Sequence, residues 1–429
     1  MIFKLAAGSG LAVLAFALIM LPNRSPIVAA DPQPLDRPAA SSYPFVIWGP
    51  DGAIARIAIP TQTPIPCPNL QLNNSPPQSM QIHAAPTLNF PVQVCQLGIP
   101  KNVTSASINQ QPLPIPKANP KNFLVIGDTG CRIEGNLQQS CNNPQQWPFA
   151  QLAQSAAMVK PDLVIHVGDY YYREGQCSKN PDCAGSPYGD RWVTWEADLF
   201  KPARPLMAAA PWVVIRGNHE DCKRGGEGWF HLLDPRPKPA QCPDYTDPYA
   251  VPAGPLNLVV LDSSLAADSK APPVQVQQYR TQFQTIAKLT KKNTWLLTHR
   301  PIWAFATATN PLNDTLQKAV KDIPLPGIQQ VLSGHVHLFA SFSFRASDHR
   351  PAQLVIGHGG TLLNYAFPSP QGKILDGAPV DQAFVLSRFG FLTLQTRNST
   401  LMQWKGKAYD PSGTVFATCE LEGRTTICR

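Results

Sequence analysis

The sequence predicts an α/β fold preceded by a smaller β-rich segment. Six short apolar runs rich in Val, Ile and Leu follow residue 121, and each of them ends in a cluster of polar residues. Runs of this length and composition are typical of strands that are buried on both faces. Residues 148–160 and 274–289 can form helices between them. With 429 residues, 43% of them hydrophobic, the chain can bury one large α/β domain and a smaller one.

The N-terminus has the features of an export signal. Lys4 precedes the apolar run LAVLAFALIML, and small residues follow at IVAADPQ. This order predicts a signal peptide over residues 1–30 with cleavage after Ala30, and an uncleaved membrane anchor is the alternative. No later stretch of the sequence is long and apolar enough to span a bilayer. We therefore expect a bacterial protein that is exported to the periplasm or secreted.

The region up to residue 120 is rich in proline and has no convincing helix. A Pro-rich leader is followed by short apolar runs that Gly and Pro interrupt. We expect the leader and a small β-rich domain within residues 31–120, ended by the linker QQPLPIPKANPKN. The catalytic domain is expected over residues 121–405, and a C-terminal β segment stapled by a disulfide over residues 406–429.

The ten cysteines agree with an oxidising compartment. Zinc binding is the competing interpretation, but no neighbouring pair has the two-residue spacing that zinc sites prefer. Disulfides between sequence neighbours are therefore the prediction, although spacing alone does not prove connectivity. The expected pairs are Cys67/Cys95, Cys131/Cys141, Cys177/Cys183, Cys222/Cys242 and Cys419/Cys428.

Charge and missing motifs limit the function classes. The net charge is +8, but only 15% of residues are charged and no long Lys/Arg run is present. Attraction to small anionic substrates is therefore a better interpretation than binding to nucleic acid or to a membrane. The sequence has neither a P-loop nor a Gly-x-Ser-x-Gly elbow, so NTPase and serine-hydrolase chemistry lack support.

Metal-binding side chains stand at the ends of five predicted strands. Because ligands bind at the carboxyl ends of strands in α/β sheets, these side chains are expected to meet. Carboxylates, imidazoles and an amide oxygen suit divalent or trivalent first-row metals, although a single strand-end Asp is often only a helix N-cap. Two metals can clamp both oxygens of a phosphoryl displacement. The residues are Asp128, Asp169, Asn218, His299, His335 and His337.

Glycine precedes four of these residues and is expected to let the backbone turn sharply off each strand. A binuclear centre needs one carboxylate that bridges both metals, and Asp169 is the candidate bridge. The glycines are Gly127, Gly168, Gly217 and Gly334.

The motifs around these residues resemble those of the calcineurin-like metallophosphoesterases and, within them, the purple acid phosphatases. Between residues 121 and 340 they are Asp-x-Gly, Gly-Asp-x-x-Tyr, Gly-Asn-His-Glu, a strand-end Thr-His and Gly-His-x-His. The resemblance implies an α+β four-layer sandwich of two mixed β-sheets flanked by helices. It also implies a binuclear-metal phosphoesterase that hydrolyses phosphate monoesters with a metal-bound hydroxide, as an acid phosphatase does.

The resemblance further implies how the ligands divide between the metals. Most metallophosphoesterases have a histidine ligand where this chain has Gly130, and Tyr172 is the implied replacement, with simple packing as its alternative. A phenolate favours a trivalent ion, so the implied pair is Fe(III) with divalent Fe, Zn or Mn. The neighbouring Tyr170 and Tyr171 are expected to pack. The first metal would be held by Asp128, Asp169, Tyr172 and His337, and the second by Asp169, Asn218, His299 and His335.

By the same resemblance, His219 contacts the phosphate or protonates the leaving group, and Glu220 orients its other nitrogen. Arg300 and Arg132 are candidates for binding phosphate, with salt bridges as the alternative. His358 could supply a further contact, because the usual histidines after the Thr-His motif are missing; an ordinary loop position is its alternative.

Two residues near the motifs are expected to be structural: His166 as a core histidine and Asp262 as a structural or capping residue. The expected partner is a small phosphorylated substrate, with no nucleic acid, and with a membrane only if the leader stays uncleaved. Phosphodiester hydrolysis on the same scaffold is one alternative. A non-catalytic, metal-binding surface protein is the other, and the complete ligand set argues against it.

Overall fold

The structure is a computed structural model that describes residues 42–396 and 403–429. The predicted signal peptide and the Pro-rich leader up to residue 41 lie outside the described residues. The described residues form one compact unit. Within the described ranges, no helix has the length and apolar character that crossing a membrane requires.

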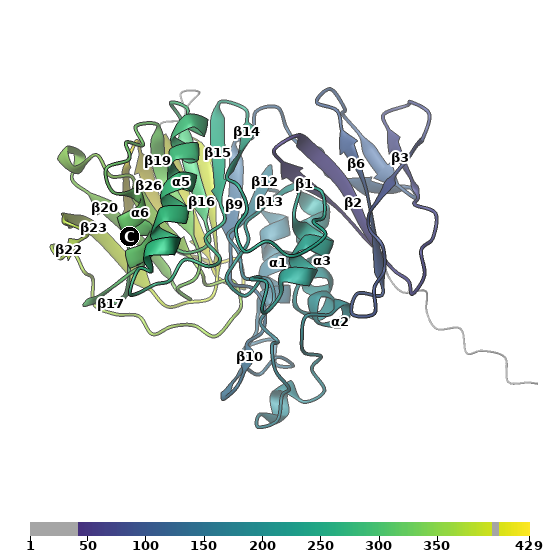
Figure 1. Ribbon diagram of the computed structural model, residues 1–429, viewed down its shortest axis with the longest axis horizontal. Helices are drawn as coiled ribbons and strands as arrows, with labels where there is room; N and C mark the ends of the chain where they lie inside the picture. The colour runs from purple at the N-terminus through teal and green to yellow at the C-terminus, as the bar shows by residue number, and fades with distance from the viewer. Residues whose placement is uncertain (1–41, 397–402) are drawn as a thin grey trace, which may run out of the picture. The chain divides into compact units, whose positions relative to one another are not determined.

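Two large mixed β-sheets form the centre of the described chain (Figure 1). The first sheet has the order β27 (Thr425–Cys428), β26 (Val415–Glu422), β25 (Gln403–Tyr409), β24 (Phe391–Thr396), β9 (Asn122–Ile126), β12 (Leu163–His166), β13 (Trp212–Val214), β1 (Tyr43–Gly49), β2 (Gly52–Pro60), β6 (Val92–Ile99) and β5 (Gln81–Ala84). The second has the order β14 (Tyr249–Ala253), β15 (Leu256–Leu261), β16 (Thr294–Thr298), β19 (Ile328–Ser333), β21 (Ala352–Ile356), β20 (Phe339–Phe344), β23 (Ala378–Leu386) and β22 (Ile374–Leu375).

All six predicted strands are confirmed, and they divide equally between the two sheets. In the first sheet β9, β12 and β13 pair in parallel, and in the second β15, β16 and β19 do so. Their residues are almost all buried, as the continuous apolar runs indicated. The carboxyl ends of both parallel groups can therefore present side chains to one site.

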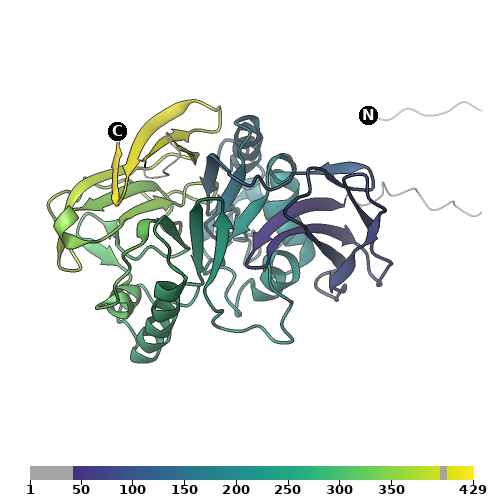
Figure 2. The same ribbon diagram turned by 90° about the horizontal axis from the view of Figure 1, so that it is seen from above.

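Helices cover the outer face of each sheet (Figures 1 and 2). Helices α1 (Phe149–Met158) and α3 (Lys201–Ala209) pack on the first sheet, in a cluster that includes Leu124 and Ile126. Helices α5 (Pro273–Leu289) and α6 (Asp314–Val320) pack on the second. The predicted helical stretches are thus α1 and α5, and the predicted four-layer arrangement of two mixed sheets between helices is confirmed.

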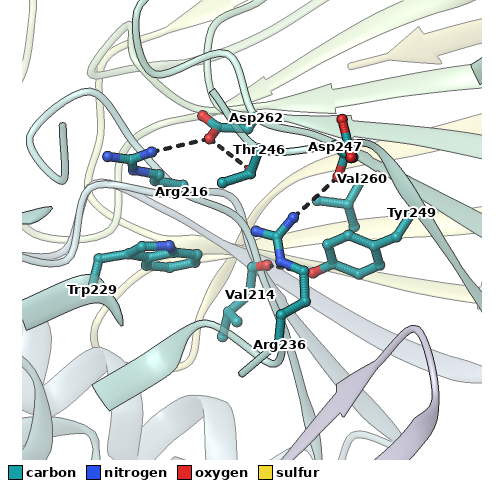
Figure 3. A pocket seen from close by; sticks show the side chains of 9 residues that line it. All are labelled: Val214, Arg216, Trp229, Arg236, Thr246, Asp247, Tyr249, Val260 and Asp262. Atoms are coloured by element: carbon teal, nitrogen blue, oxygen red, sulfur yellow. Dashed lines mark hydrogen bonds and ion pairs between the residues drawn. The ribbon is translucent and has the colours of Figure 1, made fainter. Parts of the chain in front are cut away.

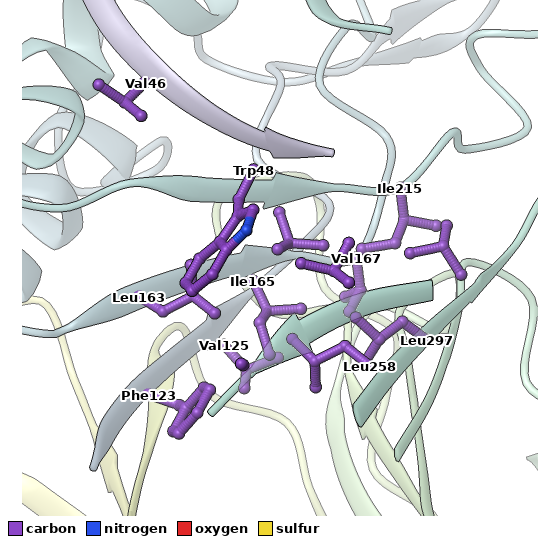
Figure 4. Close-up of a cluster of buried hydrophobic side chains, with 14 of the residues drawn as sticks. Val46, Trp48, Phe123, Val125, Leu163, Ile165, Val167, Ile215, Leu258 and Leu297 are labelled. Atoms are coloured by element: carbon purple, nitrogen blue, oxygen red, sulfur yellow. The ribbon is translucent and has the colours of Figure 1, made fainter. Parts of the chain in front are cut away.

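The core between the two sheets follows from the two-residue period of the strands. Leu124 faces the helices, whereas its neighbours Phe123 and Val125 face the second sheet. There they join side chains such as Leu258 and Leu297 in one buried cluster (Figure 4). This cluster holds the two sheets together and fixes the relation between their strand ends.

Shorter elements complete the described chain. The minor sheets contain β4 (Gln78–Ser79), β3 (Asn69–Leu72), β7 (Ala106–Ile108) and β8 (Gln111–Leu113); β10 (Ile133–Glu134) and β11 (Leu137–Gln138); and β17 (Ala304–Thr307) and β18 (Asn310–Leu312). The short helical turns are η1 (Pro181–Cys183), α2 (Trp192–Trp195), η2 (Glu196–Phe200), α4 (Gly226–Gly228), η3 (Trp229–Leu233) and η4 (Ala346–Asp348). Two of them, η2 and η3, are π-helical.

The N-terminal region is β-rich, as expected, but the expected boundary at residue 120 does not separate it from the rest. Strand β1 pairs in parallel with β13, and β2, β6 and β5 continue the first sheet beyond β1. The physical reason is that β1 is buried along almost its whole length, so it needs neighbours on both sides. A short apolar run has the same sequence pattern in a strand of a small domain and in a strand that extends a large sheet, so the sequence does not distinguish the two.

All five expected disulfides are present, and no described cysteine is free. At the C-terminal end, Cys419 and Cys428 lie opposite each other in β26 and β27. These strands extend the first sheet through β25 and β24, so residue 405 is not a domain boundary either. Five disulfides indicate a protein that folds in an oxidising, extracytoplasmic compartment.

Candidate metal centre and active site

Strand ends bring the predicted ligands together. Asp128, Asp169 and His299 follow β9, β12 and β16, and their ligand atoms lie within 4.8 Å of one another. The side chains of all three are buried. Two carboxylates and an imidazole are thus held in contact where no solvent can screen them.

The phenolic oxygen of Tyr172 lies at the centre of the first predicted ligand set. It is 2.9 Å from Asp128 Oδ1, 2.7 Å from Asp169 Oδ2 and 2.9 Å from His337 Nε2. The tyrosine is fully buried and its pKa is well above the usual range, first because of burial and then because of the two carboxylates. The four side chains therefore converge on one point.

The second predicted set is adjacent to the first. His299 Nε2 is 3.0 Å from Asn218 Oδ1 and 3.1 Å from Asp169 Oδ2. The ring of His335 stands edge-on to the ring of His299, with 5.3 Å between their centroids. Asp169 touches both sets, which is the position that a bridging carboxylate requires.

Each histidine of the cluster has one nitrogen engaged outside it. His299 Nδ1 bonds the carbonyl of Val167 at 2.8 Å, and His337 Nδ1 bonds the carbonyl of Leu362 at 2.8 Å. A carbonyl accepts only from an N–H, so each ring carries a proton on Nδ1 and, when neutral, has its Nε2 lone pair toward the cluster. Hydrogen bonds of this kind fix the tautomer of metal-binding histidines.

Three of the predicted ligands have left-handed backbone conformations. The φ angles are +57° at Asp128, +59° at Asp169 and +71° at His335. Such conformations cost of order 1 kcal/mol or more for residues with a side chain and concentrate at functional sites. Here the strain aims the side chains back across the strand ends.

The preceding glycines serve close packing more than sharp turns, which corrects the sequence-based explanation. Only Gly168 has a positive φ, of +99°. A Cβ atom at Gly217 would overlap the carboxylate of Asp169, and one at Gly334 would overlap that of Asp128. At Gly127 it would overlap a side-chain methyl of a neighbouring strand end. The ligand side chains occupy the space that these glycines leave.

Gly130 explains why no histidine ligand stands two residues after Asp128. A Cβ there would lie 2.8 Å from the carbonyl oxygen of Tyr170 and 2.9 Å from the amide nitrogen of Tyr172. The Asp198 carboxylate fills the remaining space, where it accepts hydrogen bonds from the amides of Tyr172 and Cys131. The absence of a side chain at residue 130 and the presence of the tyrosine are thus two parts of one packing arrangement.

The pKa values of the cluster are shifted in the directions that stabilise positive charge next to its buried carboxylates. Burial raises the pKa of Asp128 to about 7. Burial also opposes ionisation of Asp169, but the neighbouring His299 and His219 hold its pKa well below the usual range. Burial alone would lower the pKa of His299, yet Asp169 raises it to about 9. A bound cation would supply the charge that protons supply here.

His219 lies beside this cluster, but Glu220 does not orient it, contrary to the sequence-based expectation. His219 Nδ1 bonds Glu174 Oε1 at 2.5 Å, and its Nε2 is 3.9 Å from Asp169 Oδ2. The carboxylate of Glu220 is fully buried and accepts four backbone N–H groups, among them those of Asp169 and Gly217. Glu220 therefore fixes the loops that carry the ligands and does not touch the histidine.

Arg132 and Arg300 both lie near the cluster, each already paired. The guanidinium of Arg132 is 6.0 Å from the ring centroid of Tyr172 and bonds Glu134. Arg300 Nη1 is 2.6 Å from Asp268 Oδ2 and 2.9 Å from His335 Nε2. Both remain candidates for substrate contact, Arg132 beside Tyr172 of the first ligand set and Arg300 beside His335 of the second.

His358 does not line an accessible site, which corrects its assignment as a substrate contact. Its ring is fully buried between Phe339 and Phe416, with centroid distances of 5.3 Å and 6.2 Å. Neither ring nitrogen has a hydrogen-bond partner. The loop after β21 turns this side chain inward, a direction that the sequence pattern did not indicate.

The residues predicted to be structural make packing contacts and hydrogen bonds within the fold. Tyr170 stacks on His166 with 3.9 Å between centroids, Tyr171 stacks on Trp195, and all four rings are buried. Asp262 accepts hydrogen bonds from Arg216 and from a threonine hydroxyl beside a cavity of about 10 Å³ (Figure 3). That volume holds one water molecule and no substrate.

Three acidic residues of the site escaped sequence reasoning: Glu174, Asp198 and Asp268. Glu174 could have been found from the sequence, because it lies only two residues after Tyr172, where the Gly-Asp-x-x-Tyr motif ends. Asp198 lies on the π-helix η2, and Asp268 on the loop after β15. Neither position has a local sequence signal.

The donor set fits two metal ions. It combines carboxylates, a phenol, an amide oxygen and imidazoles, which are ligands for first-row metals. Burial lowers the pKa of His335 to about 4 and that of His337 to about 3, so both imidazoles are neutral, as metal ligands must be. The donor set at these strand ends is therefore of the kind that a binuclear metal centre requires.

Comparison with known proteins identifies the family. Residues 121–339, about half of the chain, match the family model of the calcineurin-like phosphoesterases. The chain belongs to this family, which confirms the resemblance read from the motifs. None of the curated protein sequences matches the chain.

Solved structures with a similar fold include a purple acid phosphatase, PPD1, from yellow lupin (Lupinus luteus) seeds. It has a TM-score of 0.56 and 14% identity, over 90% of this chain and 73% of that chain. PhoD is also similar, with a TM-score of 0.53 and 14% identity, over 90% of this chain and 89% of that chain. At this identity the similarity shows the shared fold.

Proposed function

We propose that this chain is an exported, binuclear-metal hydrolase of phosphate monoesters resembling the purple acid phosphatases. The observation that carries the proposal is the convergence of Asp128, Asp169 and His337 on the phenolic oxygen of Tyr172. A phenol in that position supports Fe(III) as one metal, with divalent Fe, Zn or Mn as the other. The proposed ligands are Asp128, Asp169, Tyr172 and His337 for the first metal and Asp169, Asn218, His299 and His335 for the second.

The protein's own residues would position the reactants. When bound, the metals supply an activated water and neutralise charge on the phosphoryl oxygens. His219 would hold a proton at Nε2, the nitrogen that faces Asp169, and deliver it to the leaving oxygen. Glu174 holds the opposite nitrogen and so keeps the ring in place. Arg132, beside Tyr172, and Arg300, beside His335, would contact the anionic substrate.

The proposal includes an exported location and a small-molecule partner. Five disulfides support a periplasmic or secreted location, and the apolar N-terminal run supports a signal peptide. The substrate would be a small phosphorylated molecule. No nucleic acid partner is proposed, since no basic block is present in the sequence.

The test compares p-nitrophenyl phosphate with bis-p-nitrophenyl phosphate from acidic to neutral pH. We expect faster turnover of the monoester, and loss of turnover in His219→Ala and in Asp169→Asn. His219→Ala should keep its metals, whereas Asp169→Asn should lose metal. The exposed His349 provides the control variant His349→Asn, which should match the wild type.

Preference for the diester would replace monoester hydrolysis by phosphodiester hydrolysis on the same scaffold. No turnover of either ester by protein that holds both metals would contradict the proposed function and favour a binding role. Elemental analysis of the same preparation separates these outcomes from simple loss of metal.

A further inference from the structure

Asp268 links the second predicted metal site to the loop after β15. Its Oδ2 atom is 2.9 Å from His335 Nε2 and 2.6 Å from Arg300 Nη1. Its other oxygen, Oδ1, is buried without a hydrogen-bond partner. The same carboxylate oxygen is therefore within hydrogen-bond distance of both His335 and Arg300, and the side chain of Asp268 has no other hydrogen-bond partner.

The loop that carries Asp268 is fixed by helix α6. The carbonyl of Asp268 accepts the amide N–H groups of Asn313 and Asp314, at 3.0 Å and 3.2 Å, where that helix begins. The hydroxyl of Thr315 bonds the carbonyl of Ala267 at 2.7 Å. Because these bonds hold the backbone on both sides of the peptide, the carboxylate has little freedom to leave the histidine.

The contact decides which nitrogen of His335 can bind a metal. A carboxylate accepts a hydrogen bond only from a protonated Nε2, and a neutral ring then has its lone pair on Nδ1. Arg300 Nη1 lies 2.9 Å from the same nitrogen, but a guanidinium only donates, so of these two neighbours Asp268 is the one that can accept from Nε2–H. Both His299 and His337 use a backbone carbonyl for this purpose, so His335 differs in depending on a side chain.

We propose that Asp268 is a positioning residue for His335: it accepts a hydrogen bond from Nε2–H and so directs the Nδ1 lone pair toward the second metal. This inference rests on the proposed binuclear centre and adds a residue to it. Arg300 becomes part of the same arrangement, because its Nη1 holds Asp268 in place. A carboxylate–histidine–metal chain of this kind strengthens metal binding.

The test measures metal retention and needs no substrate. Asp268→Ala is expected to weaken the second metal by about 10- to 100-fold, so that dialysis against a chelator leaves about one metal per chain. The first metal should stay, since none of its ligands touches Asp268. Asp268→Asn keeps an acceptor of the same shape and is expected to lie between Asp268→Ala and the wild type.

Asp376→Ala is the matched control. Asp376 has the same side-chain exposure as Asp268, 32%, and also pairs with an arginine, Arg350, but contacts none of the predicted ligands. We expect this variant to keep both metals. Equal loss in both variants, or full retention of the second metal in Asp268→Ala, would overturn the proposal.

The experiment separates this inference from the proposed function. If the wild-type protein binds two metals but hydrolyses no phosphate ester, the proposed function is refuted. The comparison of metal retention between the variants can still be made in that case. Wild-type protein that binds no metal at all would refute both. If Asp268→Ala fails to fold, Asp268→Asn gives the comparison, and wild-type retention in that variant together with a wild-type melting temperature counts against the proposal.

Discussion

Tyr172 is the single residue whose contacts decide the chemistry of the centre. Its oxygen touches three predicted ligands of the first metal, while its neighbours Tyr170 and Tyr171 stack on other rings. Three adjacent tyrosines thus have two different functions. The direction of each side chain separates them, because Tyr170 and Tyr171 both stack on Trp195, whereas Tyr172 reaches the carboxylates.

Replacing the phenol tests its ligation directly. Tyr172→Phe is expected to remove the visible charge-transfer absorption of the purified protein, because that absorption requires a phenolate bound to Fe(III). Tyr171→Phe is the matched control, since Tyr171 is equally buried and stacks on Trp195 without touching the cluster. An absorption spectrum that is unchanged in Tyr172→Phe would show that this tyrosine is not a ligand.

Glu174 is expected to act through His219, which a double-mutant cycle can show. His219→Ala should lower kcat by about 10²- to 10⁴-fold, as loss of a general acid does. Glu174→Gln should lower it less, and the double variant should be no worse than His219→Ala alone. Steady-state kinetics with the four proteins provide the measurement. Glu227→Gln is the control, since the exposed Glu227 bonds Thr87 and contacts none of the predicted site residues. Additive losses in the cycle would show that Glu174 does not act through His219.

At the scale of single elements, the strand ends and their following loops are tied to one another by backbone hydrogen bonds. The parallel strands β9, β12 and β13 place the loops that carry Asp128, Asp169 and Asn218 side by side. Glu220 then fastens two of these loops to each other through four backbone N–H groups. A carboxylate buried in this way also has its pKa raised to about 8, by burial and then by Asp169.

Close packing between these units makes the preceding glycines sensitive positions. Gly334→Ala is expected to displace the Asp128 carboxylate, to weaken the first metal and to lower the free energy of unfolding by about 1–3 kcal/mol. Gly98→Ala is the control, because nothing lies within 4 Å of a Cβ atom at Gly98. Metal content and urea unfolding of both variants are the measurements. Wild-type metal content in Gly334→Ala would contradict the packing argument.

The sequence predicted the strands, and which side chains meet at their ends, because both depend on local patterns. A buried strand is a continuous apolar run, and its end is marked by Asp128 or His299 in the sequence itself. Glu174 and Asp268 were missed because their partners, His219 and His335, are 45 and 67 residues away. The error at Glu220 has the same origin. Its position next to His219 in the sequence suggested a contact between them, but the Glu220 carboxylate bonds backbone N–H groups instead.

At the scale of the whole molecule, the two sheets close on a core that contains one unpaired histidine. His358 lies between Phe339 of the second sheet and Phe416 of the first, and neither ring nitrogen has a partner. Burial lowers the pKa of His358 to about 3. Desolvation has the same effect on His231 and His83, which contact backbone carbonyls elsewhere in the fold, with pKa values of about 4 and 3.

Because the pKa values of these histidines are lowered in the folded protein, we expect the protein to lose stability in acid. The unfolded chain binds a proton to each histidine below pH 6.5, whereas the folded chain keeps them neutral until about pH 3 to 4. The unfolded state therefore holds more protons in this window, and the free energy of unfolding falls as the pH falls from 6.5. For His358 alone the loss reaches about 2 kcal/mol at pH 5.

Substitution of His358 isolates its share of this pH dependence. In His358→Leu, an apolar side chain of similar volume replaces a ring with unpaired polar atoms, so stability at pH 7.5 should be equal or higher. The fall in melting temperature between pH 7.5 and pH 5 should become smaller, because one group no longer takes up a proton on unfolding. His349→Asn, at an exposed histidine, should keep the wild-type dependence. An equally steep fall in His358→Leu would mean that this ring is not held neutral by the core and that other groups govern the acid sensitivity.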